Sequence, residues 1–272
     1  MSAHQLYDTW DRTIQEMLPH ERVTRVRNLT WMIVGLQLGQ SVHLSAMARK
    51  LPLTAKLNST TDRFRRFMDN SAFRARHWYR QTAQQLLTEA AVCGKIRLIV
   101  DGTKVGAGHQ LLMVAVAYRK RALPIAWTWV RTARGHSSTD KQLALLSYVR
   151  TLIPAGIPVI VVGDCEFGAV ALAEQMDAWH WHYVLRQKSD TRVCVSHTAM
   201  DWQHFGSLVT QRQERVWYDH ALVTLKHLYH THLLGYWETG EKEPWLLITN
   251  LSEPHLALKM YRKRMWIEEI CG

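Results

Sequence analysis

The sequence predicts a mixed α/β fold in which a small all-helical region precedes a larger sheet domain. Apolar residues follow helical spacing up to about residue 92, and from Ile96 onward they form short runs of strand length. Two of these runs end in an aspartate, Asp101 and Asp164. Since ligands of α/β proteins bind where buried strands end, we expect a functional site at this edge of the sheet.

Composition narrows the class of protein. The 272 residues are 47% hydrophobic and 21% charged, which is typical of a folded protein with one large domain or two smaller ones. The formal net charge of +11 favours a polyanionic partner. The four cysteines show no zinc-ligand spacing, which favours a reduced, cytoplasmic protein. The longest apolar stretch, 29–38, is shorter than the ~20 residues that span a bilayer, and no signal-peptide pattern is seen, so we expect no membrane partner.

Positive charge is concentrated near the N-terminus. Residues 49–80 contain nine Lys or Arg and two Asp. A short helix within 41–50, a polar turn over 54–61 and a basic helix capped by Thr61 or Asp62 have the outline of a helix-turn-helix. The predicted DNA contacts on the basic helix are Arg63, Arg65 and Arg66. A solvated helix face remains the alternative.

The second part of the chain has a distinctive order of elements. The predicted strands are 96–101, 111–118, 122–130, 157–163 and 182–186, with helices over 137–152 and 169–179. Short turns join the first three strands, so these are expected to be antiparallel neighbours. The order β-β-β-α-β-α-β is that of a ribonuclease H-like fold, whose acids lie at the end of the first strand and just after the fourth. Asp101 and Asp164 occupy these positions.

These patterns predict three regions. Residues 1–92 form a helical DNA-binding region, and 93–186 together with 244–272 form the ribonuclease H-like catalytic domain. Between its two parts, 187–243 is predicted to be a β-rich insertion.

A final helix is expected over about 255–271, and it carries a third acid. Tyr261, Arg264 and Glu268 are spaced i, i+3 and i+7, so they lie on one face of an α-helix. The alternative is an ordinary amphipathic helix with a surface Arg264–Glu268 pair, which contributes little stability. Likewise, an aspartate at a strand end is often only a turn or cap residue.

At these residues the sequence resembles the DDE transposases of bacterial insertion sequences, specifically insertion-sequence family four. That group has a Tyr-Arg-Glu-Lys motif around its last acid, and the segment 261–268 matches it through the Glu. Asp101-Gly102-Thr103 and the segment 163–167 resemble the other two acid motifs. The resemblance extends from about Val23 to the end of the chain.

The resemblance implies a two-metal site and a DNA partner. Asp101, Asp164 and Glu268 would be the catalytic residues and would bind two Mg²⁺ or Mn²⁺ ions, in keeping with the oxygen ligands that Mg²⁺ prefers. Tyr261 and Arg264 would contact the DNA backbone near the cut. Trp245 stands where relatives stack a flipped base, although a core Trp at the start of a strand is an equal alternative. The double-stranded DNA would be the inverted repeats and the target, bound by a dimer, in a bacterial cytoplasm and nucleoid.

Two departures from the family pattern stand out. Cys165 follows the second acid where relatives often have Arg. The motif's Lys would fall beyond Gly272, so we expect a C-terminally truncated copy with weak or no activity. Groups of histidines, such as those at 227–232, lack the spacing of a metal site and are expected to be solvated or packed.

Three functions compete. The leading hypothesis is a transposase that binds terminal inverted repeats and catalyses strand cleavage and strand transfer. The runner-up is a catalytically inactive DNA-binding fragment that inhibits transposition. A host ribonuclease H-like nuclease is the third, and the basic N-terminal helices argue against it.

Overall fold

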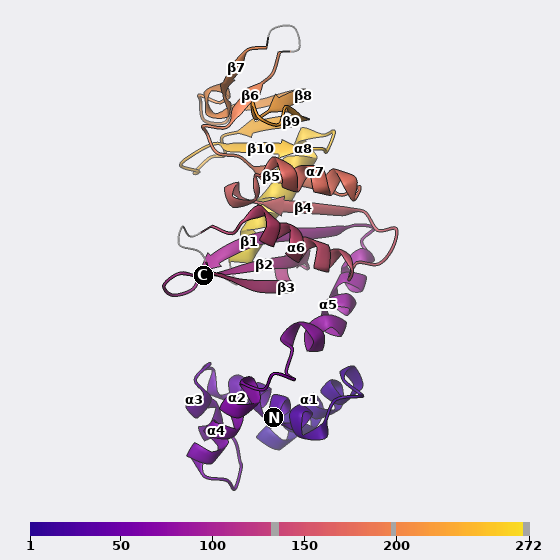
Figure 1. Ribbon diagram of the computed structural model, residues 1–272, viewed down its shortest axis with the longest axis vertical. Helices are drawn as coiled ribbons and strands as arrows, with labels where there is room; N and C mark the ends of the chain where they lie inside the picture. Colours follow the sequence, from indigo (N-terminus) through magenta and orange to yellow (C-terminus); the bar gives the residue numbers. More distant parts are fainter. Residues whose placement is uncertain (132–135, 197–199, 269–272) are drawn as a thin grey trace. The chain divides into compact units, whose positions relative to one another are not determined.

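The computed structural model describes residues 1–131, 136–196 and 200–268. The chain divides into two compact units, Met1–Thr82 and Ala83–Gly272, and each is described by itself (Figure 1). Part of the predicted final helix, 269–271, lies outside the described residues. Within the described part of the chain, no helix combines the length and the apolar character needed to cross a membrane.

The first unit is helical. It contains α1 (Ala3–Met17), α2 (Val23–Gly39), α3 (Leu44–Arg49), α4 (Leu57–Met68) and the beginning of α5 (Ala75–Ala91). Its core joins three of these helices, because Trp31 and Val34 of α2 pack with Met47 of α3 and Phe64 of α4. The apolar faces of these short helices are therefore buried against one another.

Helix α4 begins earlier than its sequence suggests. The predicted caps were Thr61 or Asp62, but the helix starts at Leu57, and the Thr61 hydroxyl donates a hydrogen bond to the Leu57 carbonyl at 2.9 Å. Thr60, Phe64 and Phe67 repeat at helical spacing and are buried. Their burial extends the helix by a turn, so packing overrides the local capping preference.

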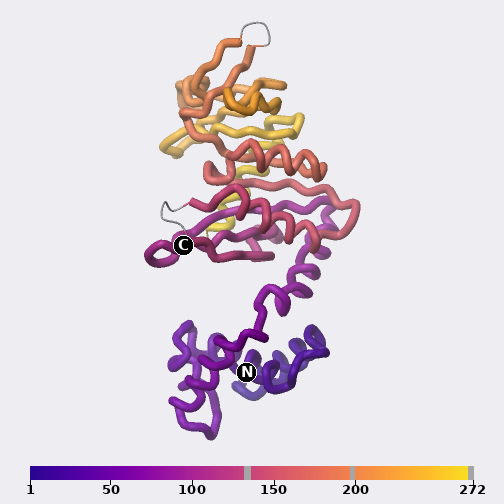
Figure 2. The backbone as a smooth tube through the Cα atoms, viewed as in Figure 1, coloured from indigo at the N-terminus to yellow at the C-terminus, as the bar shows by residue number. Residues whose placement is uncertain are grey.

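The second unit is built on one ten-stranded sheet with the order β3-β2-β1-β4-β5-β10-β9-β8-β6-β7 (Figures 1 and 2). The strands are β1 (Ile96–Lys104), β2 (His109–Tyr118), β3 (Arg121–Arg131), β4 (Val159–Gly163), β5 (His182–Arg186), β6 (Arg192–Cys194), β7 (Trp202–His204), β8 (Arg215–Val223), β9 (Tyr229–Tyr236) and β10 (Trp245–Thr249). The helices are α6 (Thr139–Arg150), α7 (Val170–Ala178), α8 (Pro254–Tyr261) and the 3₁₀ segments η1 (Cys165–Phe167), η2 (Phe205–Leu208) and η3 (Arg262–Ile267).

The predicted order of elements from β1 to β5 is confirmed. Strands β1, β2 and β3 are antiparallel neighbours, and β1, β4 and β5 are parallel neighbours. The β-rich segment after β5 does not form a separate layer, because its strands pair onward from β10 and extend the same sheet. Within the predicted β-rich insertion, β8 is one continuous strand with an irregularity in its pairing between Tyr218 and Ala221.

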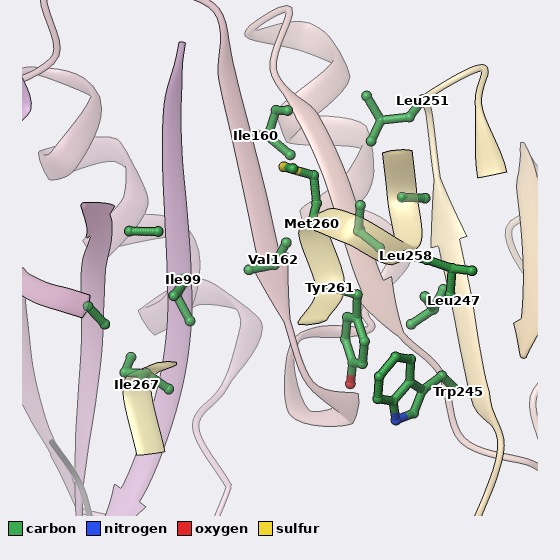
Figure 3. Close-up of a cluster of buried hydrophobic side chains, with 14 of the residues drawn as sticks. Ile99, Ile160, Val162, Trp245, Leu247, Leu251, Leu258, Met260, Tyr261 and Ile267 are labelled. Atoms are coloured by element: carbon green, nitrogen blue, oxygen red, sulfur yellow. The ribbon is translucent and has the colours of Figure 1, made fainter. Parts of the chain in front are cut away.

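One face of this sheet is covered by the end of the chain. Tyr261 and Ile267 pack with Ile99 of β1, Val162 of β4 and Leu247 of β10 in a single buried cluster (Figure 3). The predicted final α-helix is α-helical only to Tyr261 and continues as the 3₁₀ segment η3. Since 3₁₀ geometry has three residues per turn, the i, i+3, i+7 face expected of a continuous α-helix is not formed.

Candidate functional site

Two acids leave neighbouring parallel strands side by side. The register pairs Val100 of β1 with Gly163 of β4, and the next residues are Asp101 and Asp164. Strand β4 ends at Gly163, whereas β1 continues to Lys104 because its last residues stay paired with β2. The prediction that Asp101 ends its strand was therefore wrong. Asp101 is the first residue of β1 beyond its pairing with β4, so on that side its backbone has no neighbouring strand.

The third predicted acid is joined to the first by Arg264. The Arg264 guanidinium lies 2.8 Å from a Glu268 carboxylate oxygen and 3.9 Å from one of Asp101. The side chains of Arg264 and Asp101 are only 13% and 14% exposed, whereas that of Glu268 is 50% exposed. Segment η3 thus brings the third acid to the sheet through a largely buried cation.

The pKa of Arg264 is influenced by all three acids. Burial alone would lower the pKa of Arg264, but Tyr261 and the carboxylates of Asp101, Asp164 and Glu268 raise the pKa above its ordinary value. Burial raises the pKa of Asp101, and the two other carboxylates act in the same direction while Arg264 opposes them. The site therefore gathers negative charge that requires a cation.

In this structure the arginine meets that requirement. Among the described residues, no three His, Cys, Asp or Glu side chains are arranged to hold a metal ion, so the predicted two-metal site is not preformed. The Arg264 guanidinium lies within 4 Å of carboxylate oxygens of Asp101 and Glu268 and neutralises part of their negative charge. The donor set nevertheless fits a divalent metal, because three carboxylates supply the hard oxygens that Mg²⁺ or Mn²⁺ binds.

Tyr261 and Trp245 lie in the core. Their side chains are 2% and 5% exposed, and their rings meet edge to face with centroids 5.1 Å apart (Figure 3). The Tyr261 hydroxyl is buried without a hydrogen-bond partner. In this structure Trp245 occupies the core position that the sequence left as an alternative to base stacking, and neither ring is presented to solvent.

Glu166 is a fourth acid at this edge, and the sequence assigned it no role. Its carboxylate accepts hydrogen bonds from Gln110 Nε2 at 2.8 and 3.0 Å, Ser137 N at 2.8 Å and Ser137 Oγ at 2.5 Å. Its backbone N–H donates to Asp164 Oδ1 at 2.9 Å. The partners are far apart in sequence, so no local signal could have revealed this network.

Gly102 makes room for that network. A Cβ at this position would lie 2.3 Å from Gln110 Nε2 and 3.0 Å from a Glu166 carboxylate oxygen. A side chain larger than that of glycine at position 102 would therefore displace the Gln110 amide from its hydrogen bonds with Glu166. Packing around residue 102 accounts for the glycine independently of any catalytic role of Asp101.

A cavity of about 600 Å³ opens beside Cys165, the residue after Asp164. Its lining includes the cationic side chains of Arg186 and Lys188, and Arg186 lies 3.6 Å from Glu243. Burial raises the pKa of Cys165, and its thiol donates to the Gln187 carbonyl at 3.4 Å. The thiol supplies no positive charge where the family often has Arg, but Arg186 and Lys188 supply it nearby.

The three arginines predicted on α4 differ in their surroundings. Arg65 is 60% exposed and pairs with Asp62 at 2.5 Å, and Arg66 donates to the Asp62 carbonyl at 3.3 Å. Two guanidinium nitrogens of Arg63, by contrast, are buried without a hydrogen-bond partner. Burial and the neighbouring Arg27 lower the pKa of Arg63. Only Arg65 and Arg66 are presented on the exposed side of the helix.

Comparison with known proteins identifies the family. A comparison with curated proteins gives no match. Among solved structures, the chain is similar to a chain of the piggyBac transposase synaptic complex with hairpin DNA, determined by cryo-EM. The TM-score is 0.44 at 10% identity, and the match covers 98% of this chain and 65% of that chain. The family model described as transposase DDE domain matches residues 92–272, which include Asp101, Asp164 and Glu268. This chain therefore belongs to the transposase DDE domain family.

Proposed function

We propose that this chain is a transposase of the insertion-sequence family four type, which binds the terminal inverted repeats of its element and catalyses DNA strand cleavage and strand transfer. The observation that carries the proposal is that Asp101 lies on β1 and Asp164 directly follows the adjacent parallel strand β4, with Glu268 linked to Asp101 through Arg264. The strand order β3-β2-β1-β4-β5 with these directions supports a ribonuclease H-like catalytic domain. Residues 1–92 would be its DNA-binding region, with 187–243 as a β-rich insertion.

Asp101, Asp164 and Glu268 are the residues that would hold divalent metal ions. DDE transposases generally use such ions. Bound Mg²⁺ or Mn²⁺ supplies Lewis-acid stabilisation of the charge that develops on phosphate oxygens during phosphoryl transfer. The carboxylates would then bind the metal ions, and Arg264 would bind a phosphate group of the DNA. These contacts would replace the present pairing of Arg264 with Asp101 and Glu268.

The chain's own groups explain how the acids are held for this chemistry. Glu166 N fixes the Asp164 carboxylate, and the Glu166 side chain ties β2 and the start of α6 to the same edge. Arg186 and Lys188 line the cavity beside Asp164, where a phosphate group would be attracted. In the proposed reaction, water attacks the scissile phosphorus and the bond to the 3′-oxygen breaks, which leaves a 5′-phosphate and a free 3′-hydroxyl. That hydroxyl then attacks a phosphorus of target DNA, a new phosphodiester bond forms, and the target's own 3′-oxygen takes up the proton and leaves as a 3′-hydroxyl.

An inactive DNA-binding fragment is the alternative that one observation favours. Arg264 pairs with the carboxylates of Asp101 and Glu268, so a cation of the chain itself competes for these two acids. Such a chain would occupy the inverted repeats and inhibit transposition without cutting.

Nicking of a supercoiled plasmid that carries the gene and its flanking DNA tests the proposal. We expect nicking that requires Mg²⁺ or Mn²⁺, stops on chelation and is lost in Asp101→Ala and Asp164→Ala, while gel-shift binding is retained. Asp201→Ala, a change at an exposed aspartate, is the matched control and should nick normally. Binding without nicking by the unmodified chain would favour the inactive fragment. Nicking that survives in Asp101→Ala would show that the site is wrongly assigned.

A further inference from the structure

A second charged cluster adjoins the sheet face that carries Asp101. It consists of four cationic side chains, here called the cation patch, namely Lys95, Arg97, Lys259 and Lys263. Lys263 is half-buried in η3, and its ammonium lies 5.2 Å from the centre of the Trp266 ring. Burial lowers the pKa of Lys263, and the three other cations of the patch lower it further while Cys93 opposes them. Each of the other three cations is therefore close enough to Lys263 to repel it.

The cation patch has no acidic side-chain partner in the part of the chain that the structure describes. Within the described ranges 1–131, 136–196 and 200–268, none of its four side chains forms an ion pair with a carboxylate. In addition, Arg97 Nε is buried without a hydrogen-bond partner. The next residue along η3 shows the opposite case, because Arg264 faces carboxylates that raise its pKa. The cation patch therefore combines positive charges that no carboxylate neutralises with a buried donor, Arg97 Nε, that has no partner. Such a combination indicates a binding site for an external anion.

The position of the cation patch relates it to the candidate site. Arg97, Ile99 and Asp101 alternate along β1, so their side chains lie on the same face of the sheet. Ile99 packs with Ile267 of η3 between the two charged positions (Figure 3). Four residues of strand span about 13 Å, and one DNA strand carries a phosphate about every 3.4 Å along the helix axis. The distance from Arg97 to Asp101 thus corresponds to a few nucleotides.

We propose that the cation patch binds backbone phosphates of the DNA strand a few nucleotides from the scissile bond. This inference rests on the proposed function, because it assumes that DNA reaches Asp101. Lysine and arginine at this spacing would contact phosphates without reading base sequence. The cation patch would therefore add affinity and hold the strand in line with the acids, and the terminal repeat would be recognised elsewhere.

The test measures the salt dependence of DNA binding by the full chain. Fluorescence anisotropy of a labelled DNA duplex of mixed sequence is followed over a series of KCl concentrations for the unmodified chain and for Lys259→Gln/Lys263→Gln. Each lost phosphate contact reduces the slope of log K against log[salt] by about 0.9, so the double variant should lose about 1.8 from the slope. Lys259→Gln alone, at an exposed position, should lose about 0.9 and guards against misfolding of the double variant.

A matched control separates the cation patch from general charge effects. Lys141→Gln/Lys226→Gln removes the same charge from exposed positions on α6 and on the turn after β8, and its slope should equal that of the unmodified chain. If both double variants behave alike while the unmodified chain binds and nicks DNA, the proposal for the cation patch is overturned and the proposed function stands. If the unmodified chain does not bind DNA, both are overturned.

Discussion

Replacing Glu166 tests whether the buried network at the acid edge holds this part of the sheet together. The side chain is 8% exposed and accepts hydrogen bonds from the Gln110 amide and from both the N–H and the hydroxyl of Ser137. Glu166→Ala removes the acceptor from all of these donors. The Ser137 oxygen keeps one hydrogen bond in this variant, because it accepts from Gln142 Nε2 at 3.0 Å.

The magnitude follows from the donors that stay buried. The Gln110 amide and the Ser137 N–H lose their partner, and each buried unsatisfied group costs about 1–3 kcal/mol. We therefore expect Glu166→Ala to lower the free energy of unfolding by about 3 kcal/mol. Glu174→Ala on α7 removes an exposed carboxylate and should change the free energy of unfolding by less than about 0.5 kcal/mol.

Urea unfolding followed by tryptophan fluorescence measures these changes. The second unit contains nine of the twelve tryptophans, so the signal reports mainly on the sheet. A double-mutant cycle with Ser137→Ala isolates the link to the hydroxyl, because that change should cost less when Glu166 is already absent. A loss below about 1 kcal/mol in Glu166→Ala, together with additivity within about 0.5 kcal/mol, would refute the reasoning.

Three further changes have directions fixed by the structure. Burial lowers the pKa of His232 below its ordinary value of 6.5, so the unfolded chain binds a proton at this residue more readily than the folded chain. As the pH falls below 6.5, the unmodified chain should therefore lose stability relative to His232→Gln. Parallel stability profiles of the two proteins against pH would contradict this. Tyr183 is buried with its hydroxyl bonded to Tyr229 at 2.7 Å, so Tyr183→Phe should cost about 1–2 kcal/mol in urea unfolding. Tyr218→Phe is the control, because the Tyr218 hydroxyl forms no hydrogen bond among the described residues. An equal loss of stability in this variant would show that the lost hydrogen bond of Tyr183 does not explain the effect. The Tyr261 hydroxyl is buried and unpartnered, so Tyr261→Phe should melt at the same temperature or higher; a marked drop would show that the hydroxyl has a partner in solution.

The tertiary structure alone decided where several side chains point. Continuous helical periodicity near the end of the sequence did not reveal the change from α8 to η3. In the structure, Ile267 of η3 packs in the same buried cluster as Ile99, which is 168 residues away in the sequence. Burial of Tyr261 and Trp245 likewise depends on the meeting of α8 with β10. The Glu166 network joins residues up to 56 positions apart, and such contacts leave no periodic signal in a sequence.

The sequence by itself determined the order of the elements and the strands that carry the acids. Alternating apolar runs and their short connections were enough, because the burial of a strand and the tightness of a turn are local properties of the chain. The i, i+4 spacing allowed a pair between Arg264 and Glu268, but the sequence could not determine that Arg264 is largely buried and also lies 3.9 Å from Asp101, or that Lys263 lies near Arg97. Charges interact through space, and only folding sets the distances between them.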